Sequence, residues 1–389
     1  MNVLVLNPGS STLKYAFYSS GKVIQQETLS LLPSTMLPGA SLPLPGASLP
    51  GASSDSPQNQ ASIHQAFEQA IRSIASQLPK PPDAIGYRIV HGGRLFSRPI
   101  RIDDEVVDGI RSLIELAPLH QPYGLAAIEM ARSIYPTQVH VACFDTAFHT
   151  SLPELETRLP IPNRFYNQGV QRYGFHGLSY ESIAMQLEQS YPEIASGKVV
   201  ICHLGNGASV CGMREQRSFY TSMSFTPLDG LLMGTRSGHL DPGVILHWLR
   251  HGYNADEIER ILLKESGLLG VSGVSSDMRD LLTQSDSCER CRFAIDQFCL
   301  SVSKFIAVAA TSLGGLETIV FTAGIGENCP KIRSRVIEYL HWLGVRLDDV
   351  ANAKNQDGSL HHPSSPIGVF KLRTDEQLVV VQHASSMLM

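Results

Sequence analysis

The chain has 389 residues, 43% of them apolar, and its 31 basic and 36 acidic residues give a formal net charge of −5. This length and composition predict one large or two ordinary domains with a substantial core. The slight acidity argues against a nucleic-acid or membrane-surface role, which needs a basic stripe, so local cations must hold any anionic ligand.

Several features predict a soluble, cytoplasmic protein. We find no apolar run long enough to span a bilayer, and the N-terminus enters a strand without a basic region or cleavage signature. The seven scattered cysteines fit free thiols in a reducing compartment. Cys288 and Cys291 have the spacing of half a metal site, but no second pair accompanies them, so we interpret them as part of an exposed helix.

The chain begins with a predicted strand, tight loop and strand. An apolar run over residues 2–7 leads into Asn7-Pro8-Gly9-Ser10-Ser11, and apolar residues then alternate from Leu13 onward. Residues 198–213 repeat the pattern around Gly205-Asn206-Gly207. Two similar hairpins half a chain apart indicate an internal duplication.

Between the hairpins, residues 37–53 contain Leu-Pro-Gly-Ala-Ser three times and predict a mobile surface insertion. Apolar residues from Ile63 to Leu78 then share one helical face. Periodicity and turn residues further predict strands over 84–90, 138–144, 317–322 and 378–381, and helices from Pro122 and over 256–263, 292–313 and 331–340. This alternation predicts an α/β protein of two related lobes with a cleft between them.

Six segments place a polar residue where a strand gives way to a loop, and most of these loops contain glycine. Glycine beside a cation or amide lets backbone N–H groups and positive charge approach an anion. Such a series predicts a polyphosphate substrate and phosphoryl transfer. There is no P-loop, no G-x-G-x-x-G opening a helix and no G-x-S-x-G elbow. The six segments are 7–11, 87–93, 144–146, 174–177, 203–207 and 233–238.

Phosphoryl transfer needs aligned reactants, cations around the migrating group and a magnesium ion. Arg88 and Arg236 are candidates to bind an anion, although a lone arginine more often forms a surface salt bridge. His176 could donate to a transferring phosphoryl oxygen or could be a structural histidine, and His120 and His203 share this ambiguity.

Carboxylates for a metal are also present. Asp145 ends an apolar strand and could hold magnesium or cap the next helix, and Glu376 is a second candidate. The segment 324–328 lies between a strand and a helix and fits a nucleotide. The segment 277–279 could reach a ribose or base, or could simply begin a helix with Asp277 as its cap.

These motifs, in this order and over nearly the whole chain, resemble the acetate and propionate kinase family. The resemblance implies a duplicated actin-like, ribonuclease H-like fold of the acetate and sugar kinase superfamily. It implies a first lobe over 1–146 with an insertion at about 33–60, and a second, nucleotide-binding lobe over 147–389 whose last residues return to the first. It also implies a homodimer and reversible transfer between ATP and acetate, giving ADP and acetyl phosphate, with Mg²⁺ or Mn²⁺.

The resemblance further assigns roles to matching positions. Catalysis falls to Arg88, Asp145, His176 and Arg236, and magnesium to Asn7 and Glu376 beside Asp145. The acyl substrate would contact Arg88, Val90, Leu119, His120, Phe175 and Pro227. The nucleotide would contact Lys14, His203, Gly205, Asn206, Gly207, Asp277, Met278, Arg279, Gly324, Ile325, Gly326 and Asn328.

The chain departs from the family pattern in three places. Pro8 replaces the usual alanine, His239 stands where many relatives have aspartate, and the final helix looks shortened after Gln382. Two alternatives remain open at this point. One is a propionate or butyrate kinase, because Val90 favours a methyl group yet one methylene discriminates by only ~1–3 kcal/mol. The other is a non-catalytic actin-like ATP-binding module, which would have no use for two arginines and a histidine.

Overall fold

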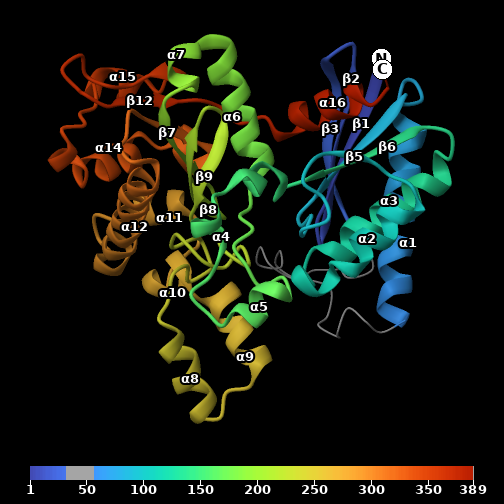
Figure 1. The fold of residues 1–389 in the computed structure, drawn as a ribbon, viewed down its shortest axis with the longest axis horizontal. Helices are drawn as coiled ribbons and strands as arrows, with labels where there is room; N and C mark the ends of the chain where they lie inside the picture. The colour runs from blue at the N-terminus through green and yellow to red at the C-terminus, as the bar shows by residue number, and fades with distance from the viewer. Residues whose placement is uncertain (32–56, 389) are drawn as a thin grey trace. The chain divides into compact units, whose positions relative to one another are not determined.

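The computed structural model describes residues 1–31 and 57–388, so the repeats at 37–53 lie outside the described residues. The chain forms two compact units (Figure 1). The first comprises Met1–Ala147 and Asp375–Met389, and the second comprises Phe148–Thr374. Each contains a six-stranded sheet with helices packed against it.

The sheet of the first unit has the order β3-β2-β1-β4-β6-β5. β1 pairs antiparallel with β2 and parallel with β4, and β6 continues the parallel part. β3 and β5 close the two edges in antiparallel fashion. The strands are β1 (Asn2–Pro8), β2 (Thr12–Ser19), β3 (Lys22–Ser30), β4 (Ala84–Ile89), β5 (Ile100–Arg101) and β6 (Val139–Phe144).

The sheet of the second unit repeats this arrangement. Its order is β11-β12-β10-β7-β8-β9, with β7 antiparallel to β8 and parallel to β10. The two hairpins even carry a register shift at the same pairing, between the second and third strands. The predicted α/β fold with an internal duplication is therefore confirmed. The strands are β7 (Lys198–Leu204), β8 (Ala208–Arg214), β9 (Arg217–Thr221), β10 (Thr318–Thr322), β11 (Gly358–Ser359) and β12 (Gly368–Lys371).

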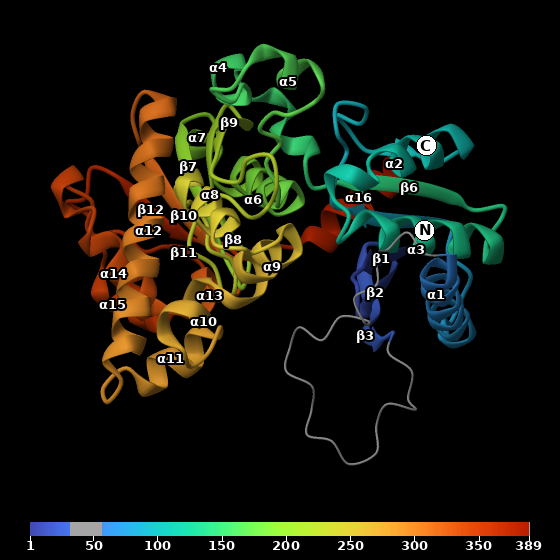
Figure 2. The same ribbon diagram turned by 90° about the horizontal axis from the view of Figure 1, so that it is seen from below.

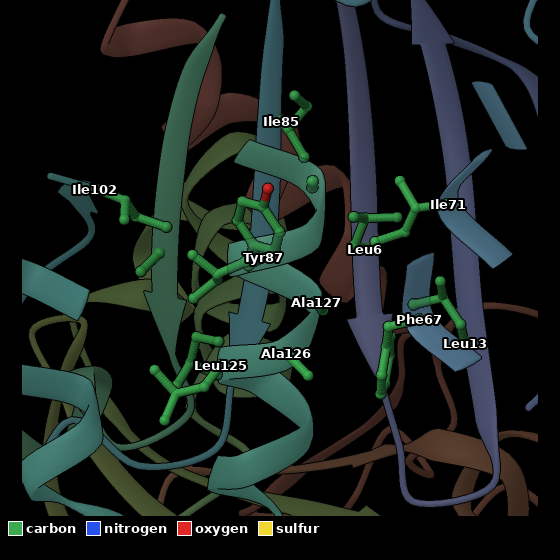
Figure 3. Packing of buried hydrophobic residues seen from close by; sticks show 14 of the residues in the cluster. Leu6, Leu13, Phe67, Ile71, Ile85, Tyr87, Ile102, Leu125, Ala126 and Ala127 are labelled. Carbon is green, nitrogen blue, oxygen red and sulfur yellow. The ribbon is translucent and has the colours of Figure 1, made fainter. Parts of the chain in front are cut away.

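Helices cover the first sheet and enclose its core. α3 presents Leu125, Ala126 and Ala127 toward strand residues such as Leu6 and Tyr87, as Figure 3 shows. α16 packs on β1, β4 and β6, and in Figure 1 it lies in red beside the blue strands. Both chain termini belong to this unit (Figure 2). The helices are α1 (Pro57–Gln77), α2 (Asp104–Ser112), α3 (Gln121–Ile134) and α16 (Glu376–Ser386).

The second unit is built around α12 (Glu289–Leu313), the long helix beside the sheet in Figure 2. It packs on β7, β8 and β9, and it ends where Gly314 takes the left-handed conformation at φ +66°. The remaining helices are α4 (Glu154–Thr157), α5 (Asn163–Asn167), α6 (Gly177–Ser190), α7 (Pro192–Ala195), α8 (Pro242–Arg250), α9 (Ala255–Arg260), α10 (Gly267–Ser272), α11 (Met278–Gln284), α13 (Ala323–Asn328), α14 (Pro330–Glu338) and α15 (Asp349–Lys354).

The expectation that no apolar run is long enough to span a bilayer needs one correction. By length and composition α12 is apolar enough to cross a bilayer, and it is the one such helix in the described part of the chain. Its buried residues recur every three or four positions, which is the pattern of a helix that packs one face on a core. These residues include Ala294, Phe298, Val302 and Ile306.

The predicted strand over 378–381 is also wrong, because these residues belong to α16. The Asp375 side chain accepts from the Leu378 N–H at 2.9 Å and caps the helix. Val379, Val380 and Val381 are all buried. Their β-branched side chains favour a strand in isolation, and burial against the first sheet outweighs that preference.

Candidate active site

A charged cluster lies at the ends of β4 and β6 in the first unit. Arg88 is the penultimate residue of β4, and Asp145 directly follows β6. The strands are parallel neighbours, and the Asp145 N–H donates to the Ile89 carbonyl at 2.9 Å, which places the carboxylate beside the guanidinium. Arg88 Nε donates to Asp145 Oδ1 at 3.0 Å and Nη2 donates to Oδ2 at 2.7 Å, so the pair is bidentate.

Glu376 joins this cluster from the first turn of α16. Its Oε2 lies 3.2 Å from Arg88 Nη1. Burial alone would lower the pKa of Arg88, but the carboxylates of Asp145 and Glu376 raise it, so the pKa lies above its ordinary value. With both carboxylates ionised, the three side chains carry a net charge of −1. The net negative charge of the cluster is therefore suited to a further cation.

The other candidates of the first unit lie at element ends. Asn7 and Lys14 are register partners across the β1–β2 hairpin, with Asn7 half-buried and Lys14 exposed. Val90 follows β4 and is half-buried, whereas the Leu119 side chain is 45% exposed. His120 is exposed at the N-terminus of α3, where the position of Pro122 in the first turn is confirmed.

In the second unit, Arg236 and His176 converge on one glycine. Gly207 lies in the turn between β7 and β8, where Gly205 N–H donates to the Gly207 carbonyl at 3.2 Å. A Cβ atom on Gly207 would lie 3.2 Å from Arg236 Nη2 and 3.5 Å from His176 Nε2. Only glycine leaves space at this point for the backbone and both side chains to face one ligand.

His176 is held in an unusual backbone conformation at the start of α6. Its φ is +59°, in the left-handed region that few non-glycine residues adopt. The neighbouring Phe175 carbonyl lies 2.9 Å from His149 Nε2, which fixes the chain on that side, and the Phe175 ring is buried. His176 Nδ1 lies 2.9 Å from Ser209 Oγ, which directs the opposite ring nitrogen toward Gly207.

His203 packs against the ring of His176. It lies in β7 and is buried, and its Nδ1 is 2.7 Å from Ser179 Oγ. The His203 and His176 rings stack with centroids 4.1 Å apart. Two parallel imidazoles this close disfavour a double positive charge.

Arg236 carries a charge that the second unit does not neutralise. Its Nη1 donates to the Pro227 carbonyl at 2.8 Å, and no carboxylate of the second unit, residues 148–374, forms an ion pair with it. Burial lowers the pKa of Arg236 below its ordinary value. Its segment is anchored by the Gly234 N–H, which donates to the Asn206 carbonyl at 2.9 Å. A buried guanidinium without a carboxylate partner is a natural anion site.

The segment 324–328 forms α13 directly after β10. Glu327 Oε1 accepts from the Ala323 N–H at 2.9 Å and from the Thr322 hydroxyl at 3.2 Å, which secures a turn where Ala323 has φ +64°. Space around Gly324 is open, whereas Gly326 packs on the β7 and β10 ends. Ile325 is half-buried, and the exposed Asn328 side chain donates to the Gly324 carbonyl at 2.9 Å.

The segment 277–279 begins α11. Asp277 caps α11 by accepting from the Arg279 N–H at 2.8 Å, and the two side chains also form an exposed ion pair. Met278 is buried. The structure therefore gives Asp277 a helix-capping role, and the exposed Arg279 guanidinium is the group left at the surface.

Several residues that support the site were not predicted. Four of them help to position His176 and His203, yet none lies in one of the six segments at strand ends: Ser209, Tyr180, Ser179 and His149. Ser209 could have been predicted, because the tight turn at Gly205–Gly207 sets the hairpin register that places Ser209 opposite His203. Arg333 has no such signal in the sequence. It is fully buried and donates to the Gly326 carbonyl at 2.7 Å and to Asn352 Oδ1 at 2.8 Å.

Comparison with known proteins identifies the family. The model described as "Acetokinase family" matches residues 2–382. An acetate kinase from Rhodopseudomonas palustris (strain TIE-1) is 42% identical over 98% of this chain and 97% of its own length. The crystal structure of Porphyromonas gingivalis acetate kinase superposes with a TM-score of 0.85 at 29% identity, covering 100% of both chains. A propionate kinase from Francisella tularensis has a TM-score of 0.82 at 29% identity, covering 99% of each. The family resemblance inferred from the motifs is thus confirmed, and the chain belongs to the acetokinase family.

Proposed function

We propose that this protein transfers the γ-phosphoryl group of ATP directly and reversibly to acetate, giving acetyl phosphate and ADP. Membership of the family makes the chain a phosphotransferase with a carboxyl group as acceptor. The observation that carries the proposal for this chain is Arg236, a guanidinium without a carboxylate partner in its unit, placed with His176 beside Gly207.

The first unit is proposed to take the acyl group. Arg88 would hold the acetate carboxylate, and Val90 and Leu119 would contact the methyl, with His120 nearby in the chain. Acetate is already ionised at neutral pH, so no general base is needed. The carboxylate oxygen can attack phosphorus as soon as the reactants are aligned.

The second unit is proposed to bind the nucleotide and the migrating group. Arg236 and His176 would donate to the equatorial oxygens of the phosphoryl group, where charge gathers as the bond to ADP breaks. Phe175 and Pro227 position these two side chains through the backbone contacts described above. The segments 205–207, 277–279 and 324–328 and His203 would contact ATP, as would Lys14 of the first unit.

Magnesium is proposed at Asp145, Glu376 and Asn7. The described residues contain no group of three histidine, cysteine, aspartate or glutamate side chains that could form a complete metal cage. Magnesium does not need one, because it commonly keeps several waters and binds through one or two carboxylates plus substrate phosphates. The two carboxylates of the cluster, which with Arg88 carries a net charge of −1, and the Asn7 amide would supply ligands for this mode. When bound, the ion neutralises and orients the phosphates.

We further propose a cytoplasmic homodimer. All seven cysteines are among the described residues and are free thiols, as expected in a reducing compartment. α8 of the second unit exposes Leu246 and Leu249, with Tyr253 exposed just beyond it, which supports a surface covered by a second subunit. Sedimentation equilibrium would distinguish a dimer from a monomer.

Trapping acetyl phosphate with hydroxylamine tests the activity. Purified protein with ATP and Mg²⁺ should form acetyl hydroxamate, with kcat/KM highest for acetate in a panel that includes propionate and butyrate. Faster turnover of propionate would assign the chain to that substrate instead. ATP binding without any acyl phosphate would reject the proposed chemistry.

Replacing Arg236 tests the proposed mechanism. Arg236→Ala should lower kcat by roughly a hundredfold or more, because one preorganised charge donor to the transition state is lost. Arg72→Ala, which removes an exposed guanidinium paired with Glu68, is the matched control and should leave kcat unchanged. Near-normal kcat in Arg236→Ala would remove Arg236 from the mechanism.

A further inference from the structure

His176 ends a buried chain of three hydrogen-bonding side chains in the second unit. Its Nδ1 lies 2.9 Å from Ser209 Oγ, and the same oxygen is hydrogen-bonded to the Tyr180 hydroxyl. Ser209 and Tyr180 are both 0% exposed. Tyr180 lies on α6, one turn after His176, while Ser209 projects from β8, so two secondary structure elements fix the geometry.

The Tyr180 hydroxyl determines which atom donates in each of these hydrogen bonds. Within the part of the chain that the structure describes, Ser209 Oγ is the one hydrogen-bond partner of the Tyr180 hydroxyl, and bulk water cannot reach it. Burial raises the pKa of Tyr180 well above its ordinary value, so the phenol keeps its proton. That proton must be donated to Ser209 Oγ, since a buried hydroxyl without an acceptor is costly.

Ser209 then has one proton to give, and its remaining partner is His176 Nδ1. Nδ1 accordingly accepts a hydrogen bond, and a neutral imidazole that accepts at Nδ1 carries its proton on Nε2. Nε2 is the nitrogen beside Gly207, near the Arg236 guanidinium. The ring thus presents an N–H donor at the place where the transferring phosphoryl group is proposed to lie.

The same series of hydrogen bonds opposes protonation of His176. An imidazolium would have to donate from Nδ1 to Ser209 Oγ, and either the Ser209 or the Tyr180 hydroxyl proton would then lack an acceptor. The neighbouring groups act in the same direction: His203 stacks on the ring and Arg236 adds a positive charge nearby. Cys211, close to Tyr180, stays a neutral thiol because burial raises its pKa to about 12.

We propose that Tyr180 is a positioning residue that, through Ser209, holds His176 as a neutral imidazole with its proton on Nε2. The role of this N–H in catalysis rests on the proposed function. The tautomer itself does not, and it can be observed without any assay of activity.

The test is a two-bond ¹H–¹⁵N correlation spectrum of the full chain labelled with ¹⁵N-histidine, with His176 assigned by its loss in His176→Gln. At pH 7.5 the wild type should show the Nε2–H tautomer alone. In Tyr180→Phe, Ser209 becomes free to accept, so the Nδ1–H form should appear and the pKa of His176 should rise. kcat should fall about tenfold, as for the loss of one buried hydrogen bond, with KM changed less than about twofold.

Tyr87→Phe is the matched control. It removes another fully buried hydroxyl that is hydrogen-bonded to an imidazole Nδ1, that of His140 at 2.7 Å, but in the first unit. It should leave the tautomer and pKa of His176 unchanged. An Nδ1–H tautomer or an imidazolium in the wild type at pH 7.5 would overturn the proposal even if Tyr180→Phe failed to fold. So would a folded Tyr180→Phe protein with an unaltered His176. Failure of the proposed function would appear differently, as wild-type protein that forms no acetyl phosphate.

Discussion

At the scale of single residues, the second unit should lose stability in mild acid because of His149. This side chain is buried between Ser218 Oγ, 2.8 Å from Nδ1, and the Phe175 carbonyl, 2.9 Å from Nε2. Burial lowers its pKa to about 4. The unfolded state, with a pKa near 6.5, binds the proton first, so stability is full above pH 6.5 and falls as the pH decreases toward 4. The expected loss from pH 6.5 to pH 5 is about 2 kcal/mol.

Tryptophan fluorescence during urea unfolding measures this loss selectively. Both tryptophans, Trp248 and Trp342, belong to the second unit, as does His149, whereas His91, whose pKa burial also lowers to about 4, belongs to the first. His149→Gln removes the titrating group and should flatten the pH dependence between pH 6.5 and pH 5. An unchanged slope in this variant would show that other groups cause the acid sensitivity.

Residue-level prediction singled out side chains where a motif marked the end of a strand. Arg88, Asp145 and Glu376 were singled out separately. Arg88 and Asp145 meet because the neighbouring parallel strands β4 and β6 end at the same edge, and Glu376 reaches Arg88 from the first turn of α16. Residue-level prediction failed for Tyr180 and Ser209, since a tyrosine on a helix and a serine in a strand carry no local signature. Their pairing depends on how α6 packs against β8, which periodicity does not specify.

At the scale of elements, the contact between α16 and β4 sets the position of Glu376. Gly86 on β4 has ordinary strand geometry, but a Cβ atom there would overlap Val380 Cγ1 of α16. Gly86→Ala should therefore push α16 outward and cost about 1–3 kcal/mol of stability. Because Glu376 lies one turn before Val380 on the same helix, its contact with Arg88 should loosen and kcat should fall.

Val380→Ala in the same chain provides the compensating change. The double variant should recover part of the stability and part of kcat, giving a coupling energy of about 0.5–3 kcal/mol in a double-mutant cycle. Thermal unfolding followed by circular dichroism, together with the hydroxamate assay, measures both quantities. Additive effects of the two substitutions would mean that the helix does not rest on this contact.

The same helix marks the limit of element prediction from sequence. Strands such as β4, β6 and β10 were placed within a residue or two, because apolar runs bounded by glycine and polar residues are specific for buried strands. A run of three valines at 379–381 satisfied the same rule and was misassigned. The deciding feature was the Asp375 cap together with a sheet surface available for a helix, and only the first of these is visible in the sequence.

At the scale of the whole molecule, the duplication could be predicted from the spacing of apolar residues. The packing of the last residues against the first unit could not. The two hairpins gave the repeat, and both sheets indeed share one order of strands. The pattern of apolar residues does not reveal that residues 375–389 pack with residues 1–147 rather than with the residues just before them. That choice depends on which sheet face lacks a helix.

Deleting residues 375–389 tests how the fold depends on this return. The deletion uncovers the face of β1, β4 and β6 that α16 covers and removes Glu376, so the first unit should become unstable and turnover should be lost. The second unit keeps its own sheet and α12, so its tryptophan-monitored unfolding should stay close to wild type.

Limited proteolysis followed by mass spectrometry should show rapid cleavage within 57–147 and survival of a fragment that begins near residue 148. The full-length chain with Gln377→Ala, which changes one half-buried side chain in the same helix, is the control and should resist protease in both units. Equal resistance of residues 57–147 in the truncated and full-length proteins would mean that the first sheet does not need α16.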